Sequence, residues 1–267
     1  MNNKNKFRKI KLFTIGTIAI FFAVIISYLI DRYSYANEQP FFSVNKINQN
    51  DILTVGIIGD SWVARKKLDS LLHQELLKIG LPNRIISSGN IGAKSKLIYQ
   101  NLFKNEDVEH SSKFIIESHP EYCIVIAGVN DSSSQIGKNY YAFHMLQIIN
   151  TLLHYEIKPI IVSLPEFDIE KTIDKMNILL KARSIISAMV NNNGIIDNIN
   201  TYRQCLKSEL IKNKLNDSIL MVDFDNVCAD HVNCKNLYID SAHLSFSGNK
   251  KLCEIIAYEL KMKEKKP

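Results

Sequence analysis

The sequence has no internal repeat and no low-complexity segment, which excludes a repeat array. It also has little excess charge once its beginning is set aside. The formal net charge is +6, and residues 1–11 contribute five positive charges and no negative one. Removing those five charges leaves +1 for the rest of the chain. The basic isoelectric point of about 8.9 therefore does not indicate a nucleic-acid-binding protein.

Composition is that of an ordinary globular protein. Of the 267 residues, 46% are hydrophobic and 22% are charged. A chain of this length can form one large domain or two small ones.

Charged residues are absent from 12–30, a run of apolar and small side chains. A helix needs roughly 20 such residues to span a bilayer. Because residues 1–11 are basic, we expect them to stay in the cytoplasm and the bulk of the chain to lie outside. The run is apolar on every face, which argues against a buried helix of a soluble domain. We therefore predict a transmembrane signal anchor over 12–30.

A cleavable signal peptide is the alternative, since Ser34-Tyr35-Ala36 suits a cleavage site, and the protein would then be secreted. The apolar run is longer than the usual ~7–15-residue core of a signal peptide, so we favour the uncleaved anchor. Residues 31–51 are polar and irregular and are interpreted as a linker between the membrane and a domain over 52–267.

Short runs rich in Ile and Val alternate with longer helical periodicities from residue 52 onward. This alternation predicts an α/β fold of three layers, α/β/α, with a central parallel sheet. The predicted strands are 52–58, 84–87, 122–127, 160–163 and 219–222. The predicted helices are 68–79, 95–103, 140–155, 173–191 and 202–214, with a last helix before the Lys-rich end.

The first predicted strand ends in Gly59-Asp60-Ser61. Ligands of open α/β sheets bind just past the carboxyl ends of the strands, so Ser61 is placed where a nucleophile could act. Gly-Asp-Ser also occurs in ordinary turns and helix N-caps. The assignment therefore depends on whether a base and an oxyanion site follow after later strands.

Two later loops can supply the oxyanion site. The loop after the second strand contains Gly92, whose backbone N–H is a candidate donor to a developing oxyanion. The third strand ends in Gly128-Val129-Asn130-Asp131, which places the Asn130 carboxamide at the same rim. Each loop taken alone is also compatible with a plain turn.

Asp240 and His243 follow the last strand, three residues apart in Asp-Ser-Ala-His-Leu-Ser. At this spacing the carboxylate can hold the imidazole Nδ1–H while Nε2 faces a serine. Such a pair can be the base and its orienting acid in a hydrolase triad with Ser61 as nucleophile, although a lone Asp-x-x-His is also common in surface turns.

Four motifs follow one another along the chain: Gly-Asp-Ser at 59–61, the glycine loop around Gly92, Gly-Val-Asn-Asp at 128–131 and Asp-x-x-His at 240–243. In this order they resemble the motifs of the SGNH/GDSL-type serine hydrolases, and the similarity covers roughly residues 52–260. The resemblance implies a flavodoxin-like fold and an esterase activity. It implies Ser61, Asp240 and His243 as the catalytic triad, and the Ser61 N–H, the Gly92 N–H and the Asn130 side chain as the oxyanion hole. Trp62 departs from the family pattern, in which a small or aliphatic residue often follows the serine. It either narrows the acyl pocket or packs on the sheet.

Cys228 and Cys234 bracket a short polar loop just before Asp240, and outside the cytoplasm such a pair can form a disulfide. A metal site would need more ligands than these two and His231, so we expect no metal and no cofactor. Cys123 lies in an apolar strand and is interpreted as a core residue. The two cysteines followed by Asp-x-x-His also resemble the extracytoplasmic SGNH domains of polysaccharide O-acyltransferases.

The expected function is that of a membrane-anchored, outward-facing serine esterase that hydrolyses O-acyl esters, with O-acetyl groups on an envelope glycan as the favoured substrate. An O-acyltransferase would use the same residues with a sugar hydroxyl in place of water. A catalytically silent glycan-binding or assembly subunit is a third reading. Expected partners are an acylated glycan or small ester, the membrane, and a membrane acyltransferase or other polysaccharide-assembly protein, but no nucleic acid.

Overall fold

The computed structural model describes residues 33–44, 52–105, 107–224 and 234–264. The chain divides into two units, Met1–Tyr35 and Ala36–Pro267, and the second contains the sheet and the predicted site residues. The predicted anchor, 12–30, lies outside the described residues. Within the described residues, no helix combines the length and apolar character needed to cross a bilayer.

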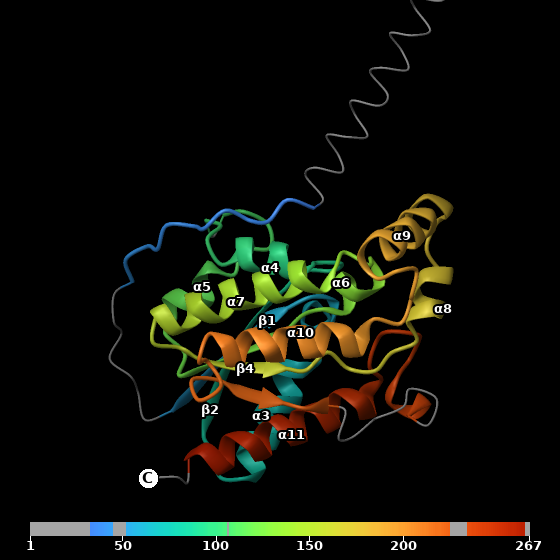
Figure 1. The fold of residues 1–267 in the computed structure, drawn as a ribbon. Coiled ribbons are helices and arrows are strands. Elements are labelled where there is room, and N and C mark those ends of the chain that lie inside the picture. Colours follow the sequence, from blue (N-terminus) through green and yellow to red (C-terminus); the bar gives the residue numbers. More distant parts are fainter. Residues whose placement is uncertain (1–32, 45–51, 106, 225–233, 265–267) are drawn as a thin grey trace, which may run out of the picture. The chain divides into compact units, whose positions relative to one another are not determined.

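The centre of the second unit is a five-stranded parallel sheet in the order β2-β1-β3-β4-β5 (Figure 1). The central strands β1, β3 and β4 are rich in apolar and β-branched residues and largely buried, with all five residues of β3 buried, whereas the edge strands β2 and β5 are mostly partly exposed. The prediction of an α/β fold with a parallel sheet is confirmed, and all five predicted strands form. Their bounds are β1 (Leu53–Gly59), β2 (Asn83–Gly89), β3 (Tyr122–Ile126), β4 (Lys158–Val162) and β5 (Leu220–Val222).

Helices cover both faces of the sheet (Figure 1). On one face α4, α7 and α10 pack together, and on the other α3 packs against α11. The long helices are α3 (Leu68–Lys78), α7 (Lys138–His154), α9 (Ile178–Asn191), α10 (Ile199–Lys212) and α11 (Phe246–Glu264). The short ones are α2 (Ser61–Ala64), α4 (Ser95–Asn101), α5 (Lys113–Glu117), α6 (Val129–Ser133), α8 (Ile169–Asp174) and the 3-10 turn η2 (Lys235–Leu237).

The helix predicted over 173–191 forms as two helices instead, α8 and α9. Asn177 separates them, because its side-chain Oδ1 accepts a hydrogen bond from the Leu180 N–H over 2.9 Å and caps α9. Hydrophobic periodicity continues across this break, so it could not reveal the new cap.

Strand order places a topological switch between β1 and β3. The chain leaves β1 toward β2 on one side and later returns to form β3 on the other. Loops diverge at such a point and leave a crevice at the carboxyl ends of the two strands. Ser61 follows β1 and Asn130 follows β3, so the fold brings both to this crevice.

Two glycines allow the chain to pack tightly beside the crevice. A Cβ added to Gly59 would lie 2.3 Å from the carbonyl oxygen of Ile126, and one added to Gly89 would lie 2.2 Å from the backbone nitrogen of Ala64. Neither position can hold a side chain without moving backbone, so β1, β2 and α2 depend on glycine here.

Residues 36–44, which the sequence analysis assigns to the linker, lie against α4 and α7. His144 of α7 is buried, and its Nε2 accepts a hydrogen bond from the Ala36 N–H over 3.0 Å. The Phe42 N–H donates to the Tyr155 hydroxyl over 2.8 Å, and the Phe41 ring stacks on the His154 ring with centroids 3.6 Å apart. This segment is irregular but belongs to the compact unit.

Candidate active site

Ser61 is the first residue of α2, directly past the end of β1. Asp60 caps this helix, since its Oδ1 accepts a hydrogen bond from the Trp62 N–H over 3.0 Å. The N–H of Ser61, in the first turn, has no intrahelical acceptor. The turn from strand to helix therefore presents both the hydroxyl and the N–H of Ser61 at the crevice.

His243 lies beside Ser61 although 182 residues separate them in the sequence. The Ser61 Oγ and the His243 Nε2 are 3.1 Å apart. The His243 Nδ1 lies 2.9 Å from Oδ2 and 3.0 Å from Oδ1 of Asp240. An ionised carboxylate only accepts hydrogen bonds, so Nδ1 carries the proton and Nε2 is free to accept the Ser61 hydroxyl proton.

Asp240 is held in the ionised form. Partial burial opposes ionisation, but hydrogen bonds from the Ala242 N–H, from the His243 ring and from the His243 N–H outweigh it and lower the pKa of Asp240. The two backbone bonds measure 2.9 and 2.8 Å. A carboxylate with this support stays charged and keeps the imidazole in one tautomer.

Three contacts fix the short loop that carries these two residues. The Ile239 N–H donates to the His243 carbonyl over 2.9 Å and closes the loop. The Asp168 N–H donates to the Ser241 carbonyl over 2.9 Å from the start of α8. The third contact comes from Trp62 and joins the loop to the helix of the nucleophile.

Trp62 is buried and donates a hydrogen bond from its indole Nε1 to the Ala242 carbonyl over 2.9 Å. Its ring also meets the Phe224 ring edge-on, with centroids 6.5 Å apart. The two alternatives from the sequence were a narrowed acyl pocket and simple packing on the sheet. The indole packs in the interior, as in the second alternative. It also binds the loop that carries Asp240 and His243, a role that could not be predicted from a sequence pattern.

Asn130, in the first turn of α6 after β3, and Gly92, in the loop after β2, are the other two predicted residues at the crevice. The Asn130 Nδ2 donates to the Ala93 carbonyl over 3.0 Å and to Asp60 Oδ2 over 3.3 Å, so its amide group is oriented. Gly92 has a φ of +74°, and an added Cβ would meet no atom within 4 Å. Its N–H donates to no backbone acceptor in the described part of the chain. The structure thus places Asn130, in the first turn of α6, in contact with the loop that carries Gly92.

Two buried carboxyl groups behind the site were not singled out from the sequence. Asp60 and Asp131 are both fully buried. Burial, opposed by the Trp62 N–H and reinforced by the charge of Asp131, raises the pKa of Asp60 to about 7. Burial also raises the pKa of Asp131, despite hydrogen bonds from the Ser95 hydroxyl and N–H of 2.6 and 2.9 Å. The sequence did contain a signal for Asp60, because an acidic residue directly after a buried strand is expected to be buried as well.

No group of three metal-ligating side chains occurs in the ranges that the structure describes. Cys234 is disulfide-bonded, whereas Cys123, Cys205 and Cys253 are free. Cys228 lies outside the described residues, so its pairing with Cys234 stays a prediction. Cys123 is buried in β3, in agreement with its interpretation as a core residue.

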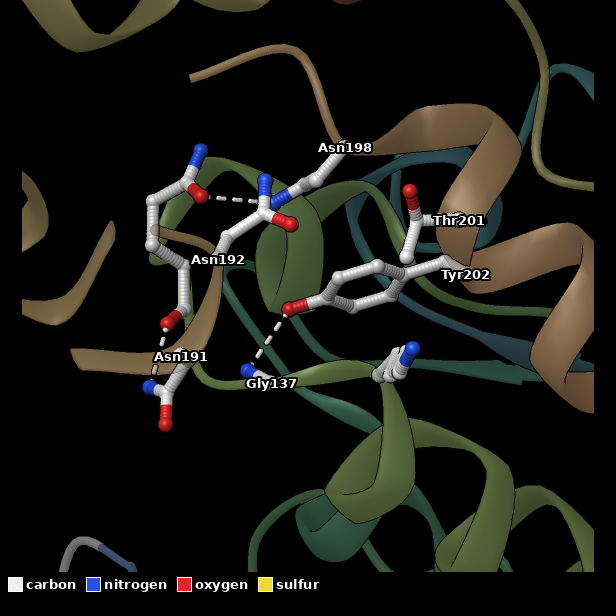
Figure 2. Close-up of a pocket in the computed structure, with 8 residues that line it drawn as sticks. Gly137, Asn191, Asn192, Asn198, Thr201 and Tyr202 are labelled. Atoms are coloured by element: carbon white, nitrogen blue, oxygen red, sulfur yellow. Dashed lines mark hydrogen bonds between the residues drawn. The ribbon is translucent and has the colours of Figure 1, made fainter. Parts of the chain in front are cut away.

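A separate small pocket with about 190 Å³ of open space lies where α6 leads into α7, lined by Gln135, Gly137, Lys138, Asn191, Asn192, Asn198, Thr201 and Tyr202 (Figure 2). Its polar groups largely bind one another. The Gly137 N–H donates to the Tyr202 hydroxyl over 2.7 Å, and the Asn191 Nδ2 donates to the Gln135 carbonyl over 2.9 Å. These bonds join α9 and α10 to the start of α7, and the pocket contains none of the predicted site residues.

No protein-family model matches the sequence, and no curated protein matches it. Solved structures do match. A lipase/acylhydrolase from Enterococcus faecalis has a TM-score of 0.58 and 15% identity, covering 79% of this chain and 97% of its own. An acetyl xylan esterase, AlAXEase, has a TM-score of 0.53 and 19% identity, covering 79% and 99%. The esterase EstA from Pseudoalteromonas sp., in a form inhibited by monoethylphosphonate, has a TM-score of 0.55 and 10% identity, covering 79% and 98%. The chain therefore shares the fold of SGNH/GDSL lipases and esterases.

Proposed function

We propose that this chain is a serine esterase of the SGNH/GDSL type. The observation that carries the proposal is the continuous hydrogen-bonded series from the Ser61 Oγ through the His243 ring to the Asp240 carboxylate. Buried serines and histidines are common, but the three groups in this order and at these distances match the arrangement that activates a serine nucleophile, which supports the proposal.

In the proposed reaction the Ser61 Oγ attacks the ester carbonyl carbon while the His243 Nε2 takes the hydroxyl proton. The negative charge on the carbonyl oxygen is stabilised by the N–H groups of Ser61 and Gly92 and by the Asn130 amide. Because the Asn130 Nδ2 already donates two hydrogen bonds, one of these is redirected to the oxyanion. His243 then returns the proton to the leaving alcohol, and water, activated by the same nitrogen, hydrolyses the acyl-enzyme.

The proposed substrate is an O-acyl ester, with O-acetyl groups on a cell-envelope glycan as the favoured class. Support comes from the apolar run over 12–30, which would hold the enzyme at the membrane with residues 52–267 outside the cytoplasm. The fold is shared with a protein described as an acetyl xylan esterase. A transferase would use the same first half-reaction and release the acyl group to a sugar hydroxyl.

Hydrolysis of p-nitrophenyl esters of increasing chain length tests the activity. We expect turnover to be highest for acetate and to fall by several orders of magnitude in Ser61→Ala. Ser118→Ala is the matched control. Its Oγ donates to the Phe114 carbonyl on α5, before β3 and so at the opposite edge of the sheet, and its turnover should equal that of the wild type. Wild-type turnover by Ser61→Ala would show the proposed triad to be wrong.

Covalent labelling provides an independent readout. An ethylphosphonate ester should modify Ser61 and no other serine, as mass spectrometry of peptides would show. Product analysis with an acetyl donor, with and without a glycan acceptor, then distinguishes water from sugar as acceptor. If acetylated glycan is the main product, the protein is an O-acyltransferase and the esterase assignment is wrong.

A further inference from the structure

Helix α9 exposes its apolar side chains and buries its small ones. Ser184, Ser187 and Ala188 face the protein and are buried. Large apolar residues of the helix and of the turn that follows it are exposed by 59–82% of their surface, namely Ile178, Leu179, Ile186, Met189, Val190 and Ile195. We call these six residues the α9 apolar face.

This orientation is the reverse of that of an ordinary surface helix. A helix on the surface of a globular protein normally turns its apolar side inward. Ile178, Ile186 and Val190 follow one another at spacings of eight and four residues, so they lie along one side of the helix. A contiguous exposed stripe of this kind is characteristic of a binding surface rather than of scattered surface residues.

The α9 apolar face lies close to the beginning of the compact unit. The Asn191 side chain at the end of α9 binds the Gln135 carbonyl and lies beside Gly137, directly before α7. The N–H of Ala36, the first residue of the unit, binds His144, six residues into α7. Six helical residues correspond to roughly 9 Å. Figure 1 shows the start of residues 36–44 and α9 toward the same side of the unit.

The chain before Ala36 points to the lipid bilayer as the surface that the α9 apolar face contacts. The apolar run over 12–30 ends five residues before the compact unit begins. Five residues and their flanking bonds span at most roughly 20 Å even when fully extended. If residues 12–30 cross a bilayer, the side of the unit around Ala36 must therefore remain near its surface, and the α9 apolar face lies on that side.

Charge agrees with a membrane surface. Residues 169–191 contain Lys171, Lys175, Lys181 and Arg183 against Glu170 and Asp174, a balance of four positive to two negative charges, and Lys181 and Asp174 pair with each other over 2.6 Å. Basic residues that flank an apolar helical stripe favour anionic lipid headgroups.

We propose that the α9 apolar face binds the surface of the lipid bilayer that anchors the chain. Helix α9 would lie in the plane of the interface, with its apolar stripe about 5–10 Å into the headgroup–acyl boundary. This inference goes beyond the esterase assignment and rests instead on the predicted anchor. The site would then act close to the membrane, in a fixed orientation toward it.

The test uses the full chain in vesicles of phosphatidylglycerol and phosphatidylcholine with brominated acyl chains. Tryptophan is introduced at Val190→Trp on the α9 apolar face, and at Tyr258→Trp on α11 as the matched control. Both positions are exposed, by 74% and 59%, so the protein should fold in each case. The native Trp62 is buried and provides a constant background. We expect Val190→Trp to lose most of its added fluorescence to the brominated lipid, and Tyr258→Trp to lose none.

Several results would overturn the proposal. Quenching at neither position would show that α9 does not enter the interface, and equal quenching at both would show that the α9 apolar face is not a specific membrane-binding surface. Protection of residue 190 that rises with protein concentration and not with lipid would identify a second copy as the occupant. Failure of the full chain to float with the vesicles would remove the anchor and this inference together. Turnover of soluble p-nitrophenyl acetate should be unchanged in Val190→Trp, which separates failure here from failure of the esterase assignment.

Discussion

The indole N–H of Trp62 donates a hydrogen bond to the carbonyl of Ala242, so the residue after the proposed nucleophile holds the residue before the proposed base. The two catalytic side chains are thus connected by a second link besides their own hydrogen bond. A displacement of about 1 Å between reacting groups can cost on the order of 10² in rate. We infer that this link maintains the distance between Ser61 and His243.

Trp62→Phe should therefore lower kcat by more than its effect on the melting temperature would explain. The variant keeps an aromatic ring near Phe224 but removes the indole donor, and we expect a loss of roughly tenfold or more in kcat on p-nitrophenyl acetate. Phe224→Leu is the control, because it removes the ring contact and leaves the hydrogen bond. Should both variants lower the melting temperature and leave kcat alone, Trp62 is only a packing residue.

Asn130→Ala should reduce kcat by about 10²–10³, the usual loss for one oxyanion donor, with a small change in KM. Ser95→Ala perturbs the same region differently, since it removes the hydroxyl bond to buried Asp131 and no donor to the substrate. That control should lower thermal stability and largely preserve kcat. Similar kinetics for the two variants would assign Asn130 a structural role.

The stability of the protein should fall as the pH drops from about 6.5 to 4, partly because of His144. Burial lowers the pKa of this histidine from 6.5 to about 4, and its Nε2 must stay unprotonated to accept the Ala36 N–H. In the window between these values the unfolded state binds the extra proton, so the contribution is complete above pH 6.5 and is lost toward pH 4. The expected size is on the order of 3 kcal/mol.

Thermal melting across this range, in wild type and in His144→Gln, measures the effect. Glutamine can accept the same hydrogen bond without titrating, so its melting temperature should vary less with pH. Parallel curves for the two proteins would show that His144 does not contribute to the acid response.

The predicted disulfide between Cys228 and Cys234 would close a loop of seven residues. Chain entropy gives such a short loop roughly 2 kcal/mol. We expect a reductant, or Cys234→Ser, to lower both the melting temperature and kcat, since the loop precedes Asp240. Thiol labelling of the unreduced, denatured protein is the direct measurement, and labelling at both cysteines would disprove the bridge.

Much of the fold could be predicted from the sequence because a buried parallel strand can be recognised from its own residues, without knowledge of distant contacts. Each of the five apolar runs is short and rich in Ile, Val or Leu, and each forms a strand within one or two residues of its predicted ends. The positions of Ser61, Asn130 and His243 after the first, third and last strands were visible for the same reason. Once a parallel sheet is assumed, its carboxyl edge collects these side chains.

Contacts between distant segments could not be predicted in this way. The periodicity of 178–190 shows which residues share a side of the helix, but not whether that side turns inward, and here it turns outward. The bond from Trp62 to Ala242 and the burial of Asp60 beside Asp131 depend on how the loops fold back, on which local pattern carries no information.

The close packing at Gly59 separates two requirements within Gly-Asp-Ser. Gly59 is needed because a Cβ would collide with the Ile126 carbonyl, and Asp60 because it caps α2 from a buried position. Ser61 has the only side chain of the three with a direct part in the proposed chemistry. In a selection of random variants for folding alone, we therefore expect Gly59 to tolerate no larger residue and Asp60 to accept only another N-capping residue, while Ser61 accepts alanine freely. A related protein that had lost catalysis could therefore keep the glycine and the aspartate of Gly-Asp-Ser and differ only at the serine.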